Sequence, residues 1–407
     1  MKLLGRVALL LACAVSLPAS SSGAAGTWSA PQAVSASPSS RLVAAAETAD
    51  GTLVAIVDYL AGGLRRSSRA PGADWVPGGT FSDPDGYVPT YSSAAVVATD
   101  GAAWLAYRVR IDDEDYVRVA RWAPDGTSKT YWDIYEPWSI VDLAVDEDND
   151  VLVTYAGRGG EPLLALYGDG TDGLERLDVP SWSADHRPHR WVLGPQEDVM
   201  LVSRFGSRLR TVDVGPDGDR RTRELPGSGA LTDELTATIA PSGTAYLAWT
   251  TASRRATRVV HVAKRTPGES WSPDRVVDVR GRGSEPQRSL EIRSTDDGAY
   301  LAWVQSGKGS TIRGALVRSG QPVAAQHVAG ARAVGDLGTT RFAIEVSSRG
   351  QLLVAWSRAR EGGGQVVVAA GRVRGEPTVA RLFDVDSVRE PIALLRRTGE
   401  ASVVSRA

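Results

Sequence analysis

The sequence predicts an all-β protein, a β-propeller of about eight four-stranded blades, with seven blades as the alternative count. Three observations lead to this prediction. Pairs of apolar segments joined by a tight turn recur along the chain, the copies have a nearly constant pitch, and no segment shows the hydrophobic period of a helix. Equal repeats of four short strands are typical of propeller blades.

Each repeat contains a predicted hairpin, and the second strand of most copies ends in an aromatic residue. Gly, Asn and Asp at the turns favour two-residue hairpin loops because they accept positive φ. Successive copies lie about 50 residues apart, which predicts one blade per copy. We expect the large side chains of this column to pack between neighbouring blades; its members are Val57, Tyr107, Tyr155, Ser203, Trp249, Trp303, Trp356 and Ser405.

Third and fourth strands are expected between the hairpins, as in residues 258–264 and 271–277. Residues 27–34 match the fourth strand at 270–277, whereas residues 391–407 offer only a first and a second strand. We therefore expect the N-terminal strand to close the ring by completing the last blade, since this covers a sheet edge. That blade is expected to lack its third strand.

The N-terminus has the pattern of a secretory signal peptide. Lys2 and Arg6 precede an apolar stretch over 7–17, and small residues follow at 20–26. The apolar stretch is shorter than the ~20 residues that span a bilayer, so we expect no transmembrane segment. The predicted organisation is a signal peptide over 1–26 and a single propeller domain over 27–407, secreted from the cell. A lipid anchor on Cys13, the one cysteine, is the alternative.

Composition excludes several function classes. The 407 residues carry a formal net charge of −2, whereas nucleic-acid binders present a strongly basic surface. Four histidines and one cysteine exclude a His/Cys zinc module. We expect no metal, no cofactor and a monomer. The oxygens of 146–150 have the spacing of a calcium loop, but they fall where a hairpin turn is predicted, and we expect a turn.

Two segments resemble the Asp box of sialidase-like (BNR) propellers, Ser-x-Asp-x-Gly-x-Thr-Trp. They are Ser-Arg-Ala-Pro-Gly-Ala-Asp-Trp at 68–75 and Lys-Arg-Thr-Pro-Gly-Glu-Ser-Trp at 264–271, in which the Asp is replaced or displaced. The chain is thus similar to a degenerate member of this superfamily. In the family the box is a fold element between third and fourth strands, so the resemblance implies shape and no catalytic role for it.

Residues 41–54 resemble the opening strand of sialidases, which bind a substrate carboxylate with three arginines. The resemblance implies that Arg41 acts with Arg288 and Arg341, which open later first strands, because a guanidinium provides a planar fork of donors. It places Glu234 where the family keeps a Glu that polarises a Tyr nucleophile. The last tyrosine, Tyr300, lies inside a hairpin strand, so no late Tyr matches that nucleophile.

Three tryptophans lie at or near the loops that enter first strands: Trp138, Trp182 and Trp191. In a propeller such loops surround one mouth of the central channel, where exposed Trp forms a platform for sugars or peptides. The sequence therefore predicts a secreted, non-catalytic propeller that binds an extracellular polysaccharide or protein at that mouth. The alternatives are a sialidase-like glycoside hydrolase that uses the arginine cluster, and a structural module of a cell-envelope assembly.

Overall fold

The computed structural model describes most of the predicted strands and many of their turns. The described residues are 10–15, 32–35, 40–59, 63–87, 92–135, 140–145, 149–156, 164–168, 175–177, 189–194, 199–205, 208–214, 219–225, 231–252, 258–272, 275–280, 290–296, 298–305, 310–318, 325–330, 342–347, 350–360, 363–373, 377–385, 391–395 and 401–406.

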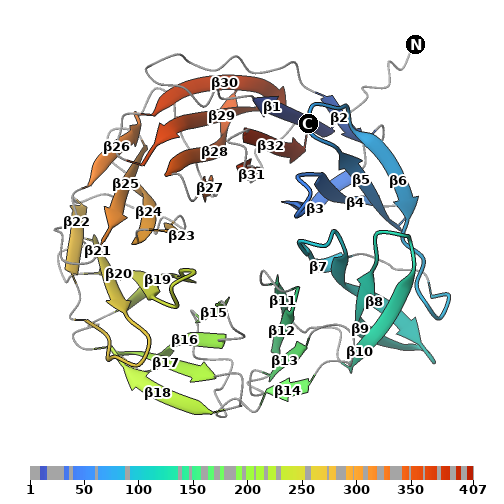
Figure 1. Ribbon diagram of the computed structural model, residues 1–407, viewed down its shortest axis with the longest axis horizontal. Coiled ribbons are helices and arrows are strands. Elements are labelled where there is room, and N and C mark those ends of the chain that lie inside the picture. The colour runs from blue at the N-terminus through green and yellow to red at the C-terminus, as the bar shows by residue number, and fades with distance from the viewer. Residues whose placement is uncertain are drawn as a thin grey trace. The chain divides into compact units, whose positions relative to one another are not determined.

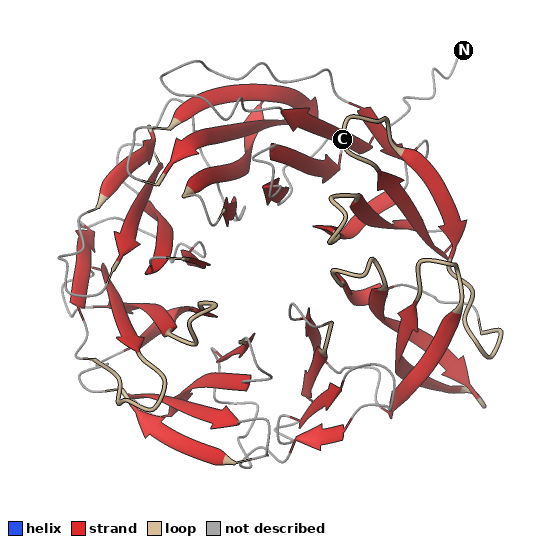
Figure 2. Ribbon diagram, viewed as in Figure 1, coloured by secondary structure: helices blue, strands red, loops and turns tan. Residues whose placement is uncertain are grey.

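Every regular element in this part of the chain is a β-strand (Figures 1 and 2). The strands form eight four-stranded sheets, and in seven of them four consecutive strands follow one another in sequence order. A search of the described residues finds no helix with the length and apolar character needed to cross a bilayer. The predictions of an all-β chain and of four-stranded sheets are therefore confirmed.

The chain forms two compact units. The first comprises residues 1–14, 29–185 and 404–407, and the second comprises 15–28 and 186–403. Three complete sheets belong to the first unit. They are sheet one, β3 (Ser40–Glu47), β4 (Leu53–Tyr59), β5 (Gly63–Arg69) and β6 (Val76–Thr80); sheet two, β7 (Ser92–Val97), β8 (Ala103–Ile111), β9 (Glu114–Trp122) and β10 (Ser128–Tyr135); and sheet three, β11 (Ile140–Val145), β12 (Val151–Ala156), β13 (Leu164–Gly168) and β14 (Glu175–Leu177).

Four complete sheets belong to the second unit. They are sheet four, β15 (His189–Leu193), β16 (Val199–Phe205), β17 (Arg208–Val214) and β18 (Arg220–Glu224); sheet five, β19 (Leu231–Ile239), β20 (Ala245–Ala252), β21 (Arg258–Arg265) and β22 (Arg275–Arg280); sheet six, β23 (Leu290–Thr295), β24 (Gly298–Gln305), β25 (Thr311–Val317) and β26 (Gln326–Ala329); and sheet seven, β27 (Phe342–Val346), β28 (Gln351–Arg360), β29 (Gly363–Arg372) and β30 (Thr378–Val385).

The eighth sheet combines strands from both ends of the sequence. Its order is β2 (Gln32–Ser35), β1 (Leu10–Val15), β32 (Ala401–Arg406) and β31 (Ile392–Leu395). In the full chain β1 occupies the third position of this sheet, so the expectation that the sheet lacks a third strand is wrong as long as residues 1–26 are present. Leu10–Val15 is the apolar run that we assigned to the leader, and a short apolar run satisfies the requirements of a buried strand equally well.

Local sequence explains the hairpins. The predicted turns contain residues with positive φ, which Gly and Asn tolerate: Gly51, Gly101, Asn149, Gly243 and Gly350. The N–H of Gly243, for example, donates to the carbonyl of Ala240 at 2.8 Å. β11 and β12 pair up to Val145 and Val151, which confirms a hairpin around Asn149, while residues 146–148 lie outside the described residues. The expected two-residue loops are wrong for the turn at Gly51, where the pair Glu47 and Leu53 leaves five residues between the strands.

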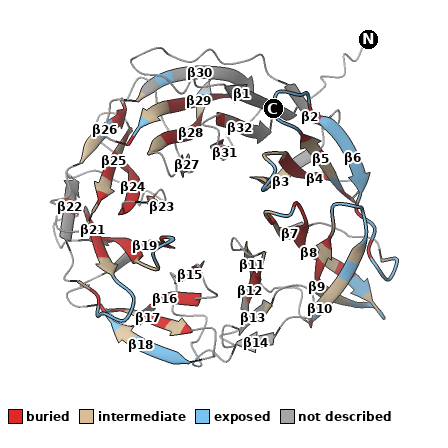
Figure 3. Ribbon diagram, viewed as in Figure 1, coloured by how far each residue is buried: buried red, intermediate tan, exposed pale blue. Residues whose placement is uncertain are grey.

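Burial follows the position of each strand in its sheet (Figure 3). The second strands β8 and β24 are mostly buried, whereas the last strands β6 and β18 are mostly exposed. Within each unit the first strands of successive sheets are neighbours: β3, β7 and β11 in one, and β15, β19, β23, β27 and β31 in the other. Neighbouring first strands and exposed last strands are the arrangement found in propeller blades.

The aromatic column packs between adjacent sheets, as the sequence predicted. Trp356 of sheet seven lies in one cluster with Tyr300 of sheet six, and Trp303 of sheet six lies in another with Ala248 of sheet five. Tyr107, Trp249, Trp303 and Trp356 are all fully buried. Large side chains at this repeat position therefore supply much of the apolar area that holds neighbouring sheets together.

Polar contacts also join successive sheets of the first unit. The guanidinium of Arg66 on β5 donates to the carbonyl of Gly101 in the next hairpin turn at 2.6 Å. In the following pair the hydroxyl of Thr99 donates to Oδ1 of Asn149 at 2.7 Å. The turn residues thus fix the register of one sheet on the next in addition to shaping each hairpin.

One buried phenol makes stability depend on pH. Burial raises the pKa of Tyr300 to about 12, although Gln326, which donates to its hydroxyl at 2.9 Å, acts in the opposite direction. The folded state therefore keeps a proton that the unfolded chain loses near pH ~10. This contribution is complete below pH ~10 and is lost as pH rises toward ~12, so we expect about 1 kcal/mol less stability at pH ~11 than at pH ~9 from this residue. Urea unfolding of wild type and Tyr300→Phe checks this, because the variant should lack that part of the decrease; equal decreases would contradict it.

Candidate functional site

A pocket of about 210 Å³ lies between two adjacent sheets of the second unit. One wall is formed by β16, β17 and β18 of sheet four, and the other by the end of β19 and the hairpin turns of sheet five. Its apolar lining residues are Val199, Met200 and Ile239, which are almost fully buried, and Pro267, which is exposed at the turn. The volume is below the ~300–1,000 Å³ of pockets for drug-sized ligands, so the pocket suits a small group such as one sugar ring.

Strand alternation brings charged side chains to this pocket. Asp219, Arg221 and Arg223 are two residues apart along β18 and its approach, so they share one face of the sheet. Asp213 on β17 is the register partner of Arg221 and lies on the same face. All four residues line the pocket.

The opposite wall is built from two turns in contact. Gly243 has φ of 75° in the β19–β20 turn, and Gly268 has φ of 78° in the β21–β22 turn. A Cβ atom on Gly243 would lie 2.8 Å from Cγ of Pro267, so the absence of a side chain allows this approach. Arg265 leads into the second turn, which is the Asp-box-like segment 264–271 at the third-to-fourth-strand position that the resemblance implied.

Arg265 and Arg223 share one carboxylate. Nη1 of Arg265 forms an ion pair with Oδ2 of Asp213, and Nε of Arg223 lies 3.3 Å from the same oxygen. The guanidinium of Arg265 also lies 5.3 Å from the ring centroid of Trp271. Trp271 is buried, and its indole N–H donates to the hydroxyl of Thr211 at 3.0 Å. Arg265 is therefore fixed by charge and by stacking, whereas Arg223 has a single, longer contact within the part of the chain that the structure describes.

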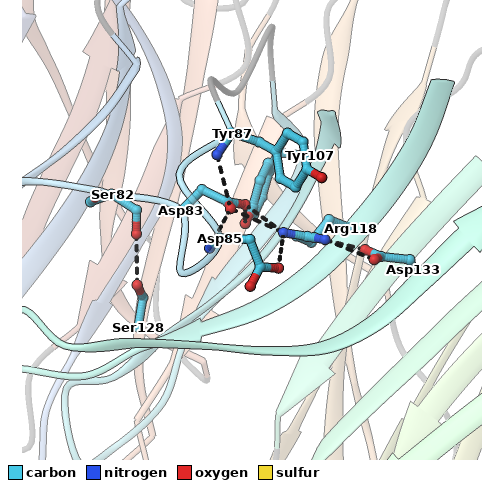
Figure 4. A network of polar contacts seen from close by, with 8 residues as sticks. All are labelled: Ser82, Asp83, Asp85, Tyr87, Tyr107, Arg118, Ser128 and Asp133. Atoms are coloured by element: carbon cyan, nitrogen blue, oxygen red, sulfur yellow. Dashed lines mark hydrogen bonds and ion pairs between the residues drawn. The ribbon is translucent and has the colours of Figure 1, made fainter. Parts of the chain in front are cut away.

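A second charged cluster lies in the first unit and is centred on Arg118 (Figure 4). Its Nε and Nη2 donate to both oxygens of Asp133 at 2.7 and 2.8 Å, and Nη1 reaches Asp83 at 3.0 Å and Asp85 at 2.6 Å. The bonds to Asp133 raise the pKa of Arg118 despite its burial. The hydroxyl of Tyr107 donates to Asp83 at 2.5 Å, and burial together with this bond raises the pKa of that phenol.

This cluster ties a connecting loop to sheet two. Oδ1 of Asp83 also accepts the backbone N–H groups of Asp85 and Tyr87 at 2.9 and 3.2 Å, so one carboxylate organises the segment between β6 and β7. The side chains of Asp83 and Arg118 are 0% and 3% exposed. Because both are already saturated with partners and closed to solvent, the arrangement has a structural role.

A third cluster lies on the first strands of sheets six and seven. Arg293 on β23 contacts Glu345 on β27 at 3.5 Å and Glu291 at 3.4 Å. Burial raises the pKa of Glu345, although Arg293 opposes this change. Burial disfavours the charged form of Arg293, but the two carboxylates outweigh it and raise its pKa. The cluster links neighbouring first strands.

The residues of the predicted arginine cluster lie mostly outside the described part of the chain. Arg288 and Arg341 are not described, and Arg41 lies in β3 without a described side chain. Glu234 lies in β19, is 8% exposed and accepts the hydroxyl of Thr250 at 3.5 Å. Convergence of these four residues stays a prediction.

The side chains of the predicted Trp platform also lie outside the described part of the chain. Trp138 and Trp182 fall outside the described residues, and Trp191 lies in β15 without a described side chain. Among the residues that the structure describes, no group of three or more His, Cys, Asp and Glu has the arrangement of a metal site. The pocket residues Arg221, Arg223 and Arg265 were not anticipated. The available signal was three arginines within the five residues of β18.

Successive four-stranded sheets with neighbouring first strands are typical of β-propellers, and the protein is similar to this class. No protein-family model matches the sequence. No curated protein matches it either.

Several solved structures have a similar fold. The BP39L lectin of Burkholderia pseudomallei is 13% identical with a TM-score of 0.55, over 85% of this chain and 99% of the lectin. A catalytically inactive variant of virginiamycin B lyase from Staphylococcus aureus is 9% identical with a TM-score of 0.42, over 90% and 96% of the two chains. An ulvan lyase is 9% identical with a TM-score of 0.48, over 84% and 92%. At these identities the likeness concerns the fold alone.

Proposed function

We propose that this protein is a secreted, non-catalytic propeller that binds an extracellular polysaccharide in the pocket between sheets four and five. The observation that carries the proposal is the composition of this pocket. The guanidinium groups of Arg221, Arg223 and Arg265 line one pocket together with the exposed ring of Pro267 and the edge of Ile239. Sugar sites combine a few oriented polar groups with a surface against which the ring packs.

The proposal includes the arrangement of the whole chain. In this proposal the sheets act as blades of one ring, and the protein is released as a monomer after removal of residues 1–26. That removal takes β1 away and leaves β2, β32 and β31 as an incomplete last blade, which β2 closes as its N-terminal strand. A lectin is among the proteins of similar fold. We extend sugar binding from that protein to this one only as part of the proposal, and the pocket provides the argument for it.

A side chain that fills the pocket is expected to abolish binding. Asp219 is exposed and lines the pocket at the start of β18, so Asp219→Trp places a large ring over the opening without disturbing the core. The wild-type protein should bind at least one polysaccharide class on a glycan array. The variant should bind that class at least about tenfold more weakly, because a ~1.4 kcal/mol loss already produces this change. The same wells are monitored for cleavage products, and none are expected.

Glu114→Trp is the matched control, because Glu114 is an exposed acidic residue on a hairpin of the first unit. It should bind like the wild type. Absence of binding to every glycan would refute the proposed function. Equal weakening by both substitutions would exclude the pocket, and turnover would replace the binding module by an enzyme.

A further inference from the structure

We propose that the pocket binds an anionic group, a carboxylate or sulfate carried by a polysaccharide; this inference rests on the proposed function and names its ligand class. Five ionisable side chains line the pocket, Asp213, Asp219, Arg221, Arg223 and Arg265. The three arginines outnumber the two aspartates, and the carboxylate of Asp213 is shared by Arg223 and Arg265. The whole chain, in contrast, carries a formal charge of −2.

Two of the three arginines can turn toward a ligand. Arg221 is exposed and has no ion-pair or hydrogen-bond partner within the described residues. Among the described residues, Arg223 is held only by its 3.3 Å contact with Asp213, and its side chain is 20% exposed. Arg265 is 11% exposed and keeps Asp213 neutralised when Arg223 moves. The pocket thus offers two neighbouring guanidinium groups to one anion, the geometry that favours bidentate recognition of carboxylate and sulfate.

Unsatisfied atoms also favour this rearrangement. Oδ1 of Asp213 and Nε of Arg265 are both buried without a hydrogen-bond partner among the described residues. Leaving a buried donor or acceptor unpaired is unfavourable. Once Arg223 leaves Asp213, Arg265 can pair with both carboxylate oxygens through its planar fork, which satisfies both atoms.

The exposed strand β18, the last of sheet four, carries three arginines among its five residues. Arg221 and Arg223 line the pocket, whereas Arg220 lies on the opposite face of the strand. On the other face of this sheet Arg208 and Arg210 share Glu224. A chain with repeated negative charges can therefore follow the exposed strand while one acidic group enters the pocket.

The apolar lining favours an acidic sugar over an acidic peptide. The exposed ring of Pro267 and the edge of Ile239 offer apolar surface beside the arginines. A uronic acid or sulfated sugar carries its charge on a rigid ring with an apolar face, so both features are used at once. An Asp or Glu side chain brings only its charge and loses rotamer entropy on binding.

Calorimetric titration with dextran, carboxymethyl dextran and dextran sulfate tests the inference, because the three polymers share one backbone and differ in charge. We expect dextran not to bind and one or both charged polymers to bind, which also distinguishes carboxylate from sulfate recognition. Arg221→Gln with Arg223→Gln should weaken binding at least about tenfold at low salt, since hydrogen bonds to charged groups are strong. Added salt should weaken binding by the wild type more than by this variant. Arg221→Lys with Arg223→Lys should restore part of the affinity.

Arg110→Gln is the control, because Arg110 is an exposed arginine of the first unit with one ion pair, to Asp115. Polyglutamate is titrated as an acidic peptide for comparison. The inference is overturned if neither charged polymer binds, if the Arg221→Gln, Arg223→Gln variant and the control bind alike, or if polyglutamate binds more tightly than both charged dextrans. If the anionic ligand class is overturned but neutral glycans on the array bind to the wild type and not to Asp219→Trp, the proposed function is still supported. Thermal unfolding of each variant confirms that it is folded.

Discussion

Replacing Arg118 by methionine should lower the free energy of unfolding by about 3–5 kcal/mol, since removal of one partner leaves a buried charge uncompensated. Nη1 of Arg118 lies 3.0 Å from Asp83, whose side chain is completely buried. In the variant Asp83 keeps its bonds from Tyr107 and from two backbone N–H groups, but it loses the guanidinium that neutralises it. The measurement is urea unfolding at neutral pH.

Arg110→Met provides a matched control on the neighbouring strand. Arg110 is 65% exposed and its partner Asp115 is 40% exposed, at 3.3 Å. Exposed pairs of this kind contribute about 0–1 kcal/mol, so the control should lose little stability. A decrease below about 1 kcal/mol for Arg118→Met would show that the cluster is not the structural centre of sheet two that its bonding indicates.

Replacing Gly314 by alanine should destabilise the second unit by about 1–3 kcal/mol, the usual effect of overfilling a packed core. Gly314 lies on β25, where an added Cβ would overlap the hydroxyl of Tyr300 and come within 2.6 Å of its Cζ atom. Tyr300 is fully buried against sheet seven, so its ring cannot move aside without disturbing the cluster around Trp356. Thermal or urea unfolding measures the loss.

A double-mutant cycle identifies the cause. In a Tyr300→Ala background the overlap is gone, so Gly314→Ala should have a much smaller effect there. Gly79→Ala is the control, because Gly79 also lies in a strand but a Cβ there meets nothing within 4 Å. If Gly314→Ala lowers the free energy of unfolding equally with and without the Tyr300 ring, the loss comes from the backbone at Gly314 and not from overlap with the ring.

The candidate site was less predictable than the strands. The turn at 264–271 was recognised from its resemblance to the Asp box, but its Arg265 gains a role only beside Asp213, 52 residues earlier. Likewise, Arg118 and Asp83 are 35 residues apart, and neither lies in a motif. An arginine in an arginine-rich sequence is not distinctive until its partners are known, so sequence reasoning favoured the first-strand arginines and the Trp residues.

The sequence by itself determined the strands, their hairpins and their repeat. These depend on local properties, such as the alternation of apolar residues and the positive φ of Gly51, Gly101 and Asn149. Only the tertiary structure decided that Leu10–Val15 supplies a strand to the eighth sheet, and that Arg221, Arg223 and Arg265 meet around Asp213. The physical reason is that ion pairs and pockets between sheets join side chains distant in sequence, and their geometry is fixed by the packing of one sheet on the next.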